Sequence, residues 1–320
     1  MIVTGTSPAP LLGAYAMAPA DPAEQREFYA ALADLPIGGL ELPLPDGDTH
    51  ADLPGRGEGV PPWDLLVTCI PTVMGRLGVL TTYGLASDDD EGRSEALDDV
   101  RRAARMAVRL ADTHGRRRVV AIQVHSAPGP GAGSGDALTR SLEEVLTWDL
   151  AGARLLVEHC DARVPGQTAA KGFLTLEQEI VAVRRAAGDP HGAGGSPAGL
   201  SINWGRSAIE GRSAGTPVAH VEAAAAAGLL GAVVLSGATD VDTAWGPAWA
   251  DAHIPPRGQD PALAGSTGSL LDAAAAAATL RAAGPACPVA VKISVRPKDA
   301  DVATRLAVAR AALELVAAAR

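Results

Sequence analysis

Aromatic residues are scarce in this sequence: only 3% of its 320 residues are Phe, Trp or Tyr, whereas 47% are hydrophobic. A buried core must therefore be aliphatic, made of Val, Leu, Ile and the abundant Ala. Cysteine is scarce as well, and Cys69, Cys160 and Cys287 are far apart, with no CxxC spacing. Such a sparse, odd set is typical of reduced thiols in a cytosolic protein.

Positive charge is the next shortage, since 27 Lys and Arg stand against 37 Asp and Glu, and the formal net charge is −10. A nucleic-acid partner requires a basic face that neutralises phosphates, so we expect no binding to nucleic acid or to an anionic membrane. The first residues lack a charged segment followed by a long apolar one, and no run of about 18 uncharged apolar residues occurs. We therefore expect neither a signal peptide nor a membrane span, and a cytoplasmic location.

What the sequence does contain is a series of eight short apolar runs, most of which end in a polar residue. The runs cover residues 11–17, 38–44, 64–70, 119–126, 154–161, 198–206, 229–238 and 287–295. Continuous Val, Leu and Ile runs are typical of parallel strands buried on both faces, and most of the gaps hold a helix-length segment. Eight such strand–helix units predict a closed (β/α)8 TIM barrel, with residues 1–320 as a single domain.

One unit of the predicted barrel is irregular. Residues 45–63, between the second and third strands, are rich in Pro, Gly and Asp, so we expect the second helix to be reduced or missing. Residues 71–92 and 237–268 are interpreted as long loops at the carboxyl ends of strands, where barrel enzymes have their active sites. Thr175 and Gln178 predict a capping box at the start of the helix that follows the fifth strand.

Polar side chains recur near the ends of the predicted strands, and they share one parity. Because every second side chain of a barrel strand points inward, residues of this parity are expected to form a ring inside the barrel. The ring consists of Glu41, Thr68, Gln123, His125, Glu158, Ser201, Asn203, Ser236 and Lys292. Burial of so many polar groups is costly unless they are satisfied, which favours a functional site over a structural polar plug.

Glu158 is the strongest candidate in this ring, because a carboxylate at a strand end can bind a divalent metal or move a proton. A structural salt bridge to Lys292 across the barrel is the alternative. His125 can serve as a metal ligand or as a general acid or base. Asp251 and His253, one residue apart in the seventh loop, can close on one metal if that loop folds inward.

Together with the eight-strand layout, three features resemble the xylose-isomerase-like TIM barrel superfamily: the strand ending VEHCD at 157–161, His125, and the Asp251-x-His253 pair. This superfamily includes sugar-phosphate isomerases, ketose epimerases and endonuclease IV. More narrowly, the chain resembles a bacterial branch with no assigned activity. The resemblance implies metal ligands at the ends of strands five to eight, with Glu158 as the fifth-strand glutamate. It also implies that His125 matches the fourth-strand histidine of the endonuclease-like members, and that Asp251 and His253 match their Asp-x-His pair.

The sequence departs from the superfamily pattern at three strand ends. Asn203 stands where an aspartate is usual, Ser236 where a histidine is common, and Lys292 where a glutamate normally closes the site. An ammonium group at Lys292 would repel a divalent cation beside it. Either the site holds no metal, and Lys292 stabilises an enolate instead, or one divalent ion (Mn, Mg, Zn or Co) has moved. The ligands of such a relocated ion would be His125, Glu158, Asp251 and His253.

Cationic and aromatic side chains gather in the loops at the same end of the predicted barrel. Arginine suits bidentate binding of carboxylate or phosphate, and indole faces stack on sugar rings. The cations are Lys171, Arg206, Arg212, Arg257 and Arg296, and the tryptophans are Trp204, Trp245 and Trp249. With Glu41 and Asn203 from the ring, they predict a binding site for a small-molecule substrate, a polyol or sugar that is neutral or anionic.

These features favour an isomerase or epimerase acting on a sugar or sugar derivative. Glu158 would be the base or a metal ligand, His125 a second acid or base, and Lys292 an electrostatic stabiliser. Two alternatives stay open: a lyase or aldolase in which Lys292 forms a Schiff base, and a non-catalytic sugar-binding barrel, which the lost metal ligands favour. The acidic charge balance and the incomplete ligand set disfavour a DNA-repair nuclease.

Overall fold

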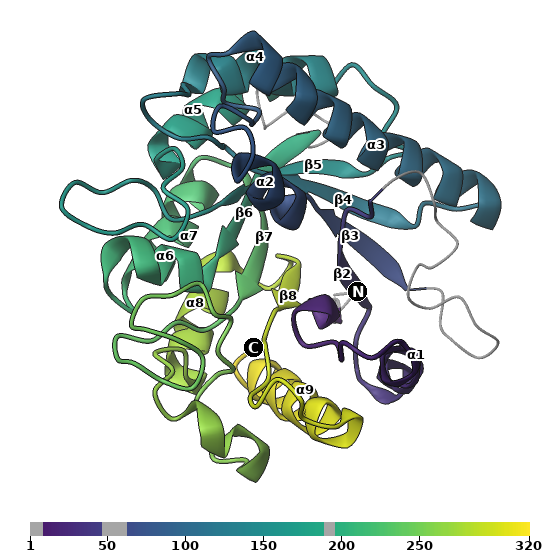
Figure 1. Ribbon diagram of the computed structural model, residues 1–320, viewed down its shortest axis with the longest axis vertical. Helices are drawn as coiled ribbons and strands as arrows, with labels where there is room; N and C mark the ends of the chain where they lie inside the picture. The colour runs from purple at the N-terminus through teal and green to yellow at the C-terminus, as the bar shows by residue number, and fades with distance from the viewer. Residues whose placement is uncertain (1–8, 47–62, 189–195) are drawn as a thin grey trace, which may run out of the picture.

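The computed structural model describes residues 9–46, 63–188 and 196–320. Eight parallel strands pair in sequence order, and the last pairs with the first to close a barrel (Figure 1). They are β1 (Leu11–Leu12), β2 (Gly39–Pro43), β3 (Asp64–Thr68), β4 (Val119–Val124), β5 (Arg154–His159), β6 (Ala198–Asn203), β7 (Leu230–Leu235) and β8 (Val289–Val291). The predicted (β/α)8 barrel is confirmed, and each strand lies inside one of the eight apolar runs.

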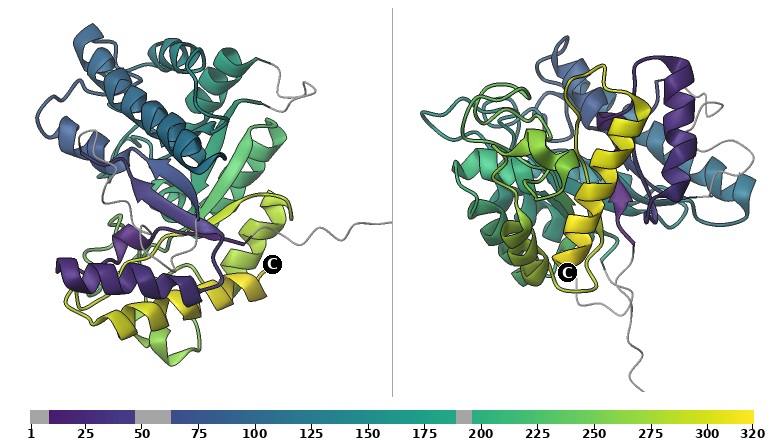
Figure 2. Two further views of the ribbon diagram at one scale, coloured as in Figure 1. Left: turned by 90° about the vertical axis from the view of Figure 1, so that its right-hand side faces the viewer. Right: turned by 90° about the horizontal axis from the view of Figure 1, so that it is seen from below.

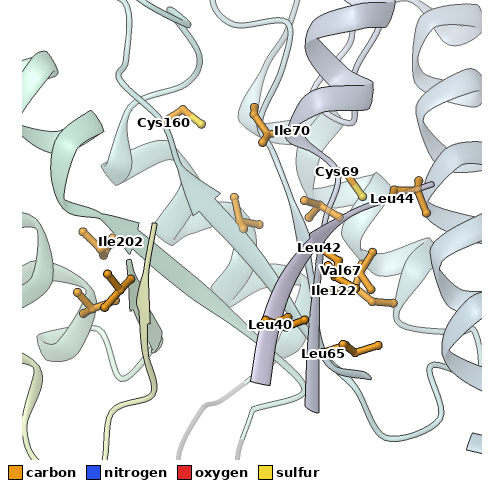
Figure 3. Close-up of a cluster of buried hydrophobic side chains, with 14 of the residues drawn as sticks. Leu40, Leu42, Leu44, Leu65, Val67, Cys69, Ile70, Ile122, Cys160 and Ile202 are labelled. Carbon is orange, nitrogen blue, oxygen red and sulfur yellow. The ribbon is translucent and has the colours of Figure 1, made fainter. Parts of the chain in front are cut away.

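The two faces of the barrel wall have different side chains. Those that point outward are mostly apolar and buried beneath the helices, as Figure 3 shows for Leu40, Leu42, Val67 and Ile122. A small apolar cluster fills part of the interior; it consists of Leu66, Ala121, Leu156 and Ala232. Two positions further along the same strands, Leu66, Ala121 and Leu156 are followed by Thr68, Gln123 and Glu158. All three of these polar residues are fully buried. The interior therefore changes from apolar to polar toward the carboxyl ends of the strands.

Helices surround the barrel and cover its outer face (Figures 1 and 2). They are α1 (Pro22–Ala31), α2 (Ile70–Leu77), α3 (Asp90–His114), α4 (Gly135–Val145), α5 (Leu176–Ala187), α6 (Trp204–Gly211), α7 (Thr216–Ala226), α8 (Ala273–Ala283) and α9 (Val302–Ala318). The first and last of them, α1 and α9, lie side by side where β1 meets β8. The predicted capping box is confirmed: Thr175 Oγ1 accepts from Gln178 N, and Gln178 Oε1 accepts from Thr175 N.

Two segments differ from the sequence-based expectation. The loop expected over 71–92 contains most of α2, which starts directly after β3, and the first residues of α3. Helix α6 starts directly after β6 because Asn203 caps it, with Oδ1 accepting from Arg206 N at 3.3 Å. The expected loss of the second helix concerns mainly residues 47–62, which lie outside the described residues. Within the described ranges, we find no helix with the length and apolar character needed to span a bilayer.

Candidate functional site

The carboxyl ends of β4, β5 and β6 bring three of the predicted residues into contact. His125 Nε2 lies 2.8 Å from Glu158 Oε2, and Asn203 Nδ2 donates to Glu158 Oε1 at 3.0 Å. All three residues are buried. In the strand register Glu158 pairs with Ser201, two residues before Asn203, which explains why the amide reaches the carboxylate. Both oxygens of Glu158 are thus engaged.

Arg206 reaches the same carboxylate from the first turn of α6. Its Nη1 lies 2.6 Å from Glu158 Oε2 and its Nε lies 3.2 Å from Asp251 Oδ2, so one guanidinium bridges two carboxylates. The helix comes this close to the barrel because residue 205 is glycine: a Cβ on Gly205 would lie 2.6 Å from the carbonyl oxygen of Ser236. Only 1% of the Arg206 side chain is exposed, which makes it a fixed interior cation.

A second ion pair joins β2 to the residue that follows β8. Lys292 Nζ lies 2.9 Å from Glu41 Oε1, and both side chains are fully buried. The Tyr15 hydroxyl donates to Glu41 Oε1 at 3.4 Å, and Lys292 Nζ lies 5.1 Å from the Tyr15 ring centre, within cation–π range. A Cβ on Gly13 would lie 2.9 Å from Lys292 Cγ, so glycine leaves room for the lysine stem. The ion-pair partner of Lys292 is thus Glu41 rather than Glu158.

The loop after β7 brings Asp251 and His253 to the same cluster. Asp251 Oδ2 lies 3.2 Å from Lys171 Nζ as well as from Arg206, and Asp251 Oδ1 lies 3.4 Å from His253 Nδ1. His253 Nδ1 is also 2.9 Å from Ser236 Oγ, just beyond β7. Ionic contacts with Lys171, in the loop after β5, and with Arg206, in α6, therefore hold this loop at the barrel mouth.

The buried charges of this cluster balance. The carboxylates are Glu41, Glu158 and Asp251, and the cations in contact with them are Lys171, Arg206 and Lys292. Burial acts to raise the pKa of Glu158 and of Asp251, but the nearby cations, Arg206 above all, outweigh it and hold both pKa values well below the usual range. Burial lowers the pKa of His125, and it lowers the pKa of His253 to about 3. At neutral pH both carboxylates are ionised and both imidazoles are neutral.

Two groups of metal-binding residue types occur among the described residues, and one of them lies in this site: His125, Glu158 and Cys160. These donors do not fit a divalent ion as they are arranged. Arg206 Nη1 already contacts Glu158 Oε2 and donates to Cys160 Sγ at 3.2 Å, so a cation holds the position. Burial also raises the pKa of the Cys160 thiol well above its ordinary value, which keeps it a poor ligand. The relocated set predicted from the sequence meets the same obstacle, because Arg206 contacts Asp251 too.

Three buried polar atoms of the ring have no hydrogen-bond partner among the described residues: Glu41 Oε2, Gln123 Oε1 and His125 Nδ1. Each belongs to a side chain whose other polar atom is engaged. Gln123 Nε2 donates to Ser201 Oγ at 2.9 Å, and His125 Nε2 is held by Glu158. An unpartnered buried polar atom costs about 1–3 kcal/mol. These atoms therefore mark where a polar ligand would be bound.

The three tryptophans predicted to bind substrate have separate environments. Trp204 is the first residue of α6 and lies fully buried in the hydrophobic core, because a helix stands where a loop was expected. Trp245 lines a small cavity of about 80 Å³ beside α9, and its Nε1 donates to the carbonyl oxygen of Ser294 at 3.3 Å. The guanidinium of Arg212 lies 5.2 Å from the Trp249 ring centre.

Arg206 is the predicted arginine that joins the ionised cluster, and the other three have structural partners. Arg212 donates to Gln167 Oε1 and to the carbonyl oxygen of Thr168. Arg257 forms an ion pair with Asp272 at 2.7 Å, with 51% of its side chain exposed. Arg296 donates to the backbone carbonyl oxygens of Ala244 and Val295 and lines the same cavity as Trp245. The structure thus brings together Glu41, His125, Glu158, Asn203, Arg206, Asp251, His253 and Lys292.

Tyr15 is a site residue that the sequence reasoning missed. The available signal was its place just beyond the first strand, where a side chain at the carboxyl end of the barrel is expected. A polar group outside the barrel was missed as well. His159 follows Glu158 in β5 and therefore points to the opposite face of the wall, where it contacts Glu179 and Glu210.

The fold is similar to that of solved xylose isomerase-like TIM barrels. The IolI protein, crystallised with a bound zinc atom, has 14% identity and a TM-score of 0.55, over 96% of this chain and 97% of that chain. D-psicose 3-epimerase from Clostridium cellulolyticum H10, crystallised with D-tagatose, has 16% identity and a TM-score of 0.54, again over 96% and 97%. At these identities the similarity shows the fold alone.

Sequence comparison defines the family more narrowly. The family model DUF4862, described as a domain of unknown function, matches residues 11–308, and the chain belongs to this family. The uncharacterized protein STM3670 of Salmonella typhimurium (strain LT2) is 34% identical over 261 residues, which are 77% of this chain and 77% of that protein.

Proposed function

We propose that this protein is an isomerase or epimerase acting on a sugar or sugar derivative, with His125 as the group that moves the proton. The observation that carries the proposal is the buried His125–Glu158 pair. Glu158 holds His125 Nε2 at 2.8 Å, while Nδ1 has no partner among the described residues. A neutral imidazole oriented by a carboxylate is a competent general base. The sugar epimerase among the barrels of the same fold supports the substrate class.

In this proposal His125 Nδ1 takes a proton from a carbon next to the substrate carbonyl. The electrons of the C–H bond form a carbon–carbon double bond, and the carbonyl π electrons move to oxygen as a negative charge. Lys292 and Arg206 supply fixed positive charge near that oxygen, and Glu158 stabilises the imidazolium. The proton of the neighbouring hydroxyl passes to the enolate oxygen, and His125 returns the carbon-bound proton to the former carbonyl carbon, so that the neighbouring oxygen becomes the new carbonyl. One base therefore suffices for the carbon-to-carbon transfer in isomerisation. Epimerisation would require a second proton donor on the opposite face.

A neutral sugar fits the site better than an anionic one. Each cation of the cluster already contacts a carboxylate, so no cation of the cluster is left for a phosphate or an acid group. The unpartnered oxygens of Glu41 and Gln123 accept hydrogen bonds, as hydroxyl groups of a polyol would donate them. We therefore propose an unphosphorylated aldose or ketose as the substrate.

Deuterium exchange tests this function without knowledge of the product. The protein is incubated in D2O with a panel of neutral aldoses and ketoses, and proton NMR follows the C–H signals next to the carbonyl. We expect one or more sugars to lose such a signal, with isomerised product appearing. A sugar that binds tightly in calorimetry yet shows neither exchange nor product would contradict catalysis and favour the binding barrel instead.

The alternative function, a Schiff-base lyase, requires a deprotonated amine at Lys292. Burial alone would lower the pKa of Lys292, but the contacting Glu41 carboxylate and Tyr15 hold it well above its ordinary value. A protonated amine does not attack a carbonyl. We therefore expect intact-mass spectrometry to show no adduct after borohydride treatment with the same sugars. A reduced imine on Lys292, absent from a Lys292→Met variant, would establish the lyase mechanism.

A further inference from the structure

A second buried polar cluster lies outside the barrel wall, between the end of β5 and helices α5, α6 and α7. His159 Nε2 lies 3.0 Å from Glu210 Oε2 on α6. On α7, His220 Nε2 lies 3.7 Å from Glu210 Oε1. We propose that His159, Glu210 and His220 form a binding site for one zinc ion, separate from the ionised cluster inside the barrel.

The spacing of the three side chains suits zinc. With metal–ligand bonds of about 2.0–2.1 Å, neighbouring ligand atoms of a tetrahedral site are about 3.3 Å apart. The distances to Glu210, 3.0 Å from His159 Nε2 to Oε2 and 3.7 Å from His220 Nε2 to Oε1, are close to this value, and one donor atom from each residue falls within 4.8 Å of the others. The two imidazole rings lie edge to face, with centroids 4.9 Å apart and planes at 75°. Two imidazoles and one carboxylate are an established zinc ligand set.

Each imidazole also has its other ring nitrogen engaged. His159 Nδ1 lies 2.7 Å from Glu179 Oε2, and His220 Nδ1 lies 3.0 Å from Ser207 Oγ. Zinc-binding histidines ordinarily donate their second N–H to such an oxygen, which fixes the ring and leaves Nε2 free for the metal. Ser126 Oγ in turn donates to the other oxygen of Glu179. The supporting contacts of a zinc site are therefore present.

The charge and the position of the cluster favour an ion there. Burial alone would lower the pKa of His159, but Glu179 and Glu210 raise it to about 10, so a proton on Nε2 links it to Glu210 when no ion is bound. A divalent ion would replace that proton and neutralise the two carboxylates. The side chains of Glu210 and His220 are 16% and 15% exposed, so an ion can enter from solvent and keep water as its fourth ligand. A bound ion would link β5, α6 and α7. Because β5 carries Glu158 and α6 carries Arg206, it would brace the elements that hold the barrel's ion pair.

Cobalt titration tests the site, because Co²⁺ in low coordination absorbs visible light far more strongly than hydrated Co²⁺. The full-length protein is stripped with a chelator and titrated with Co²⁺, and Zn²⁺ is then added. We expect about one equivalent of Co²⁺ to bind with strong visible bands that Zn²⁺ abolishes. His220→Ala and Glu210→Gln should each weaken binding at least about 100-fold, and Ser207→Ala, which removes only a supporting contact, about 10–100-fold.

Variants of the barrel cluster distinguish the two locations. Glu158→Gln and His253→Gln should keep the cobalt spectrum and its affinity, since neither residue belongs to the outer cluster. The proposal is wrong if folded wild-type protein gives no bands beyond those of hydrated Co²⁺, which would leave His159 as a bridge between two glutamates. It is also wrong if the bands survive in both His220→Ala and Glu210→Gln, or vanish in the barrel variants.

Discussion

Replacement of His125 by glutamine is expected to slow deuterium exchange into the substrate by about 10²–10⁴-fold, the usual contribution of a general base. The glutamine amide nitrogen can still donate to Glu158 from the position of Nε2, so the buried carboxylate keeps a partner. What is lost is Nδ1, the atom without a partner among the described residues. The measurement is the exchange rate at saturating sugar, with calorimetry to show that the sugar still binds.

The matched control is Glu158→Gln, singly and combined with His125→Gln. If the two residues act as one unit, the double variant should be no slower than the slower single variant. The pH profile adds a second readout. Because burial lowers the pKa of His125, the base stays neutral below its ordinary pKa, and the wild-type rate should not fall as the pH drops through 6.5. Unchanged exchange in His125→Gln would show that another group moves the proton.

The inward ring could be predicted because strand parity and apolar runs are local properties of the sequence. Glu158, His125 and Lys292 stand at the ends of runs whose alternate residues are apolar, and the structure buries all three. Pairing within the ring could not be predicted in the same way. Lys292 pairs with Glu41, 251 positions away, and that choice depends on how the barrel closes between β8 and β1.

Arg206 shows where sequence reasoning failed. The residue was expected in a loop because the strand pattern ran on to position 206. The structure ends the strand at Asn203, whose side chain caps a helix, and that helix lies against β7 because Gly205 has no side chain. The local signal, Asn203 with a glycine two residues later, is compatible with many turns. Only the tertiary contact with Ser236 sends the arginine into the barrel.

Replacement of Arg206 by methionine is expected to destabilise the protein by about 3–5 kcal/mol, the usual cost of removing one partner of a buried ion pair. Glu158 and Asp251 would both lose their shared cation. Urea unfolding measures the change. Arg257→Met is the control, because Arg257 forms an ion pair that is half exposed, and its loss should cost no more than about 1 kcal/mol.

Neutralising the carboxylates should restore most of the stability that the Arg206→Met variant loses. In a triple variant, Arg206→Met with Glu158→Gln and Asp251→Asn, the amides need no cation, so stability should return toward that of the wild type. The pH dependence gives the same test without further substitution. The wild-type carboxyls have lowered pKa values, so they stay ionised and keep their stabilisation until the pH falls below about 4. Without Arg206 burial raises these pKa values, so the carboxyls of the variant take up protons at higher pH, and this relieves part of the destabilisation. The difference in the free energy of unfolding between the wild type and the Arg206→Met variant should therefore narrow toward pH 5. If this difference in unfolding free energy stays constant with pH, and the triple variant is no more stable than Arg206→Met, then Arg206 acts through packing and its charge does not hold the site together.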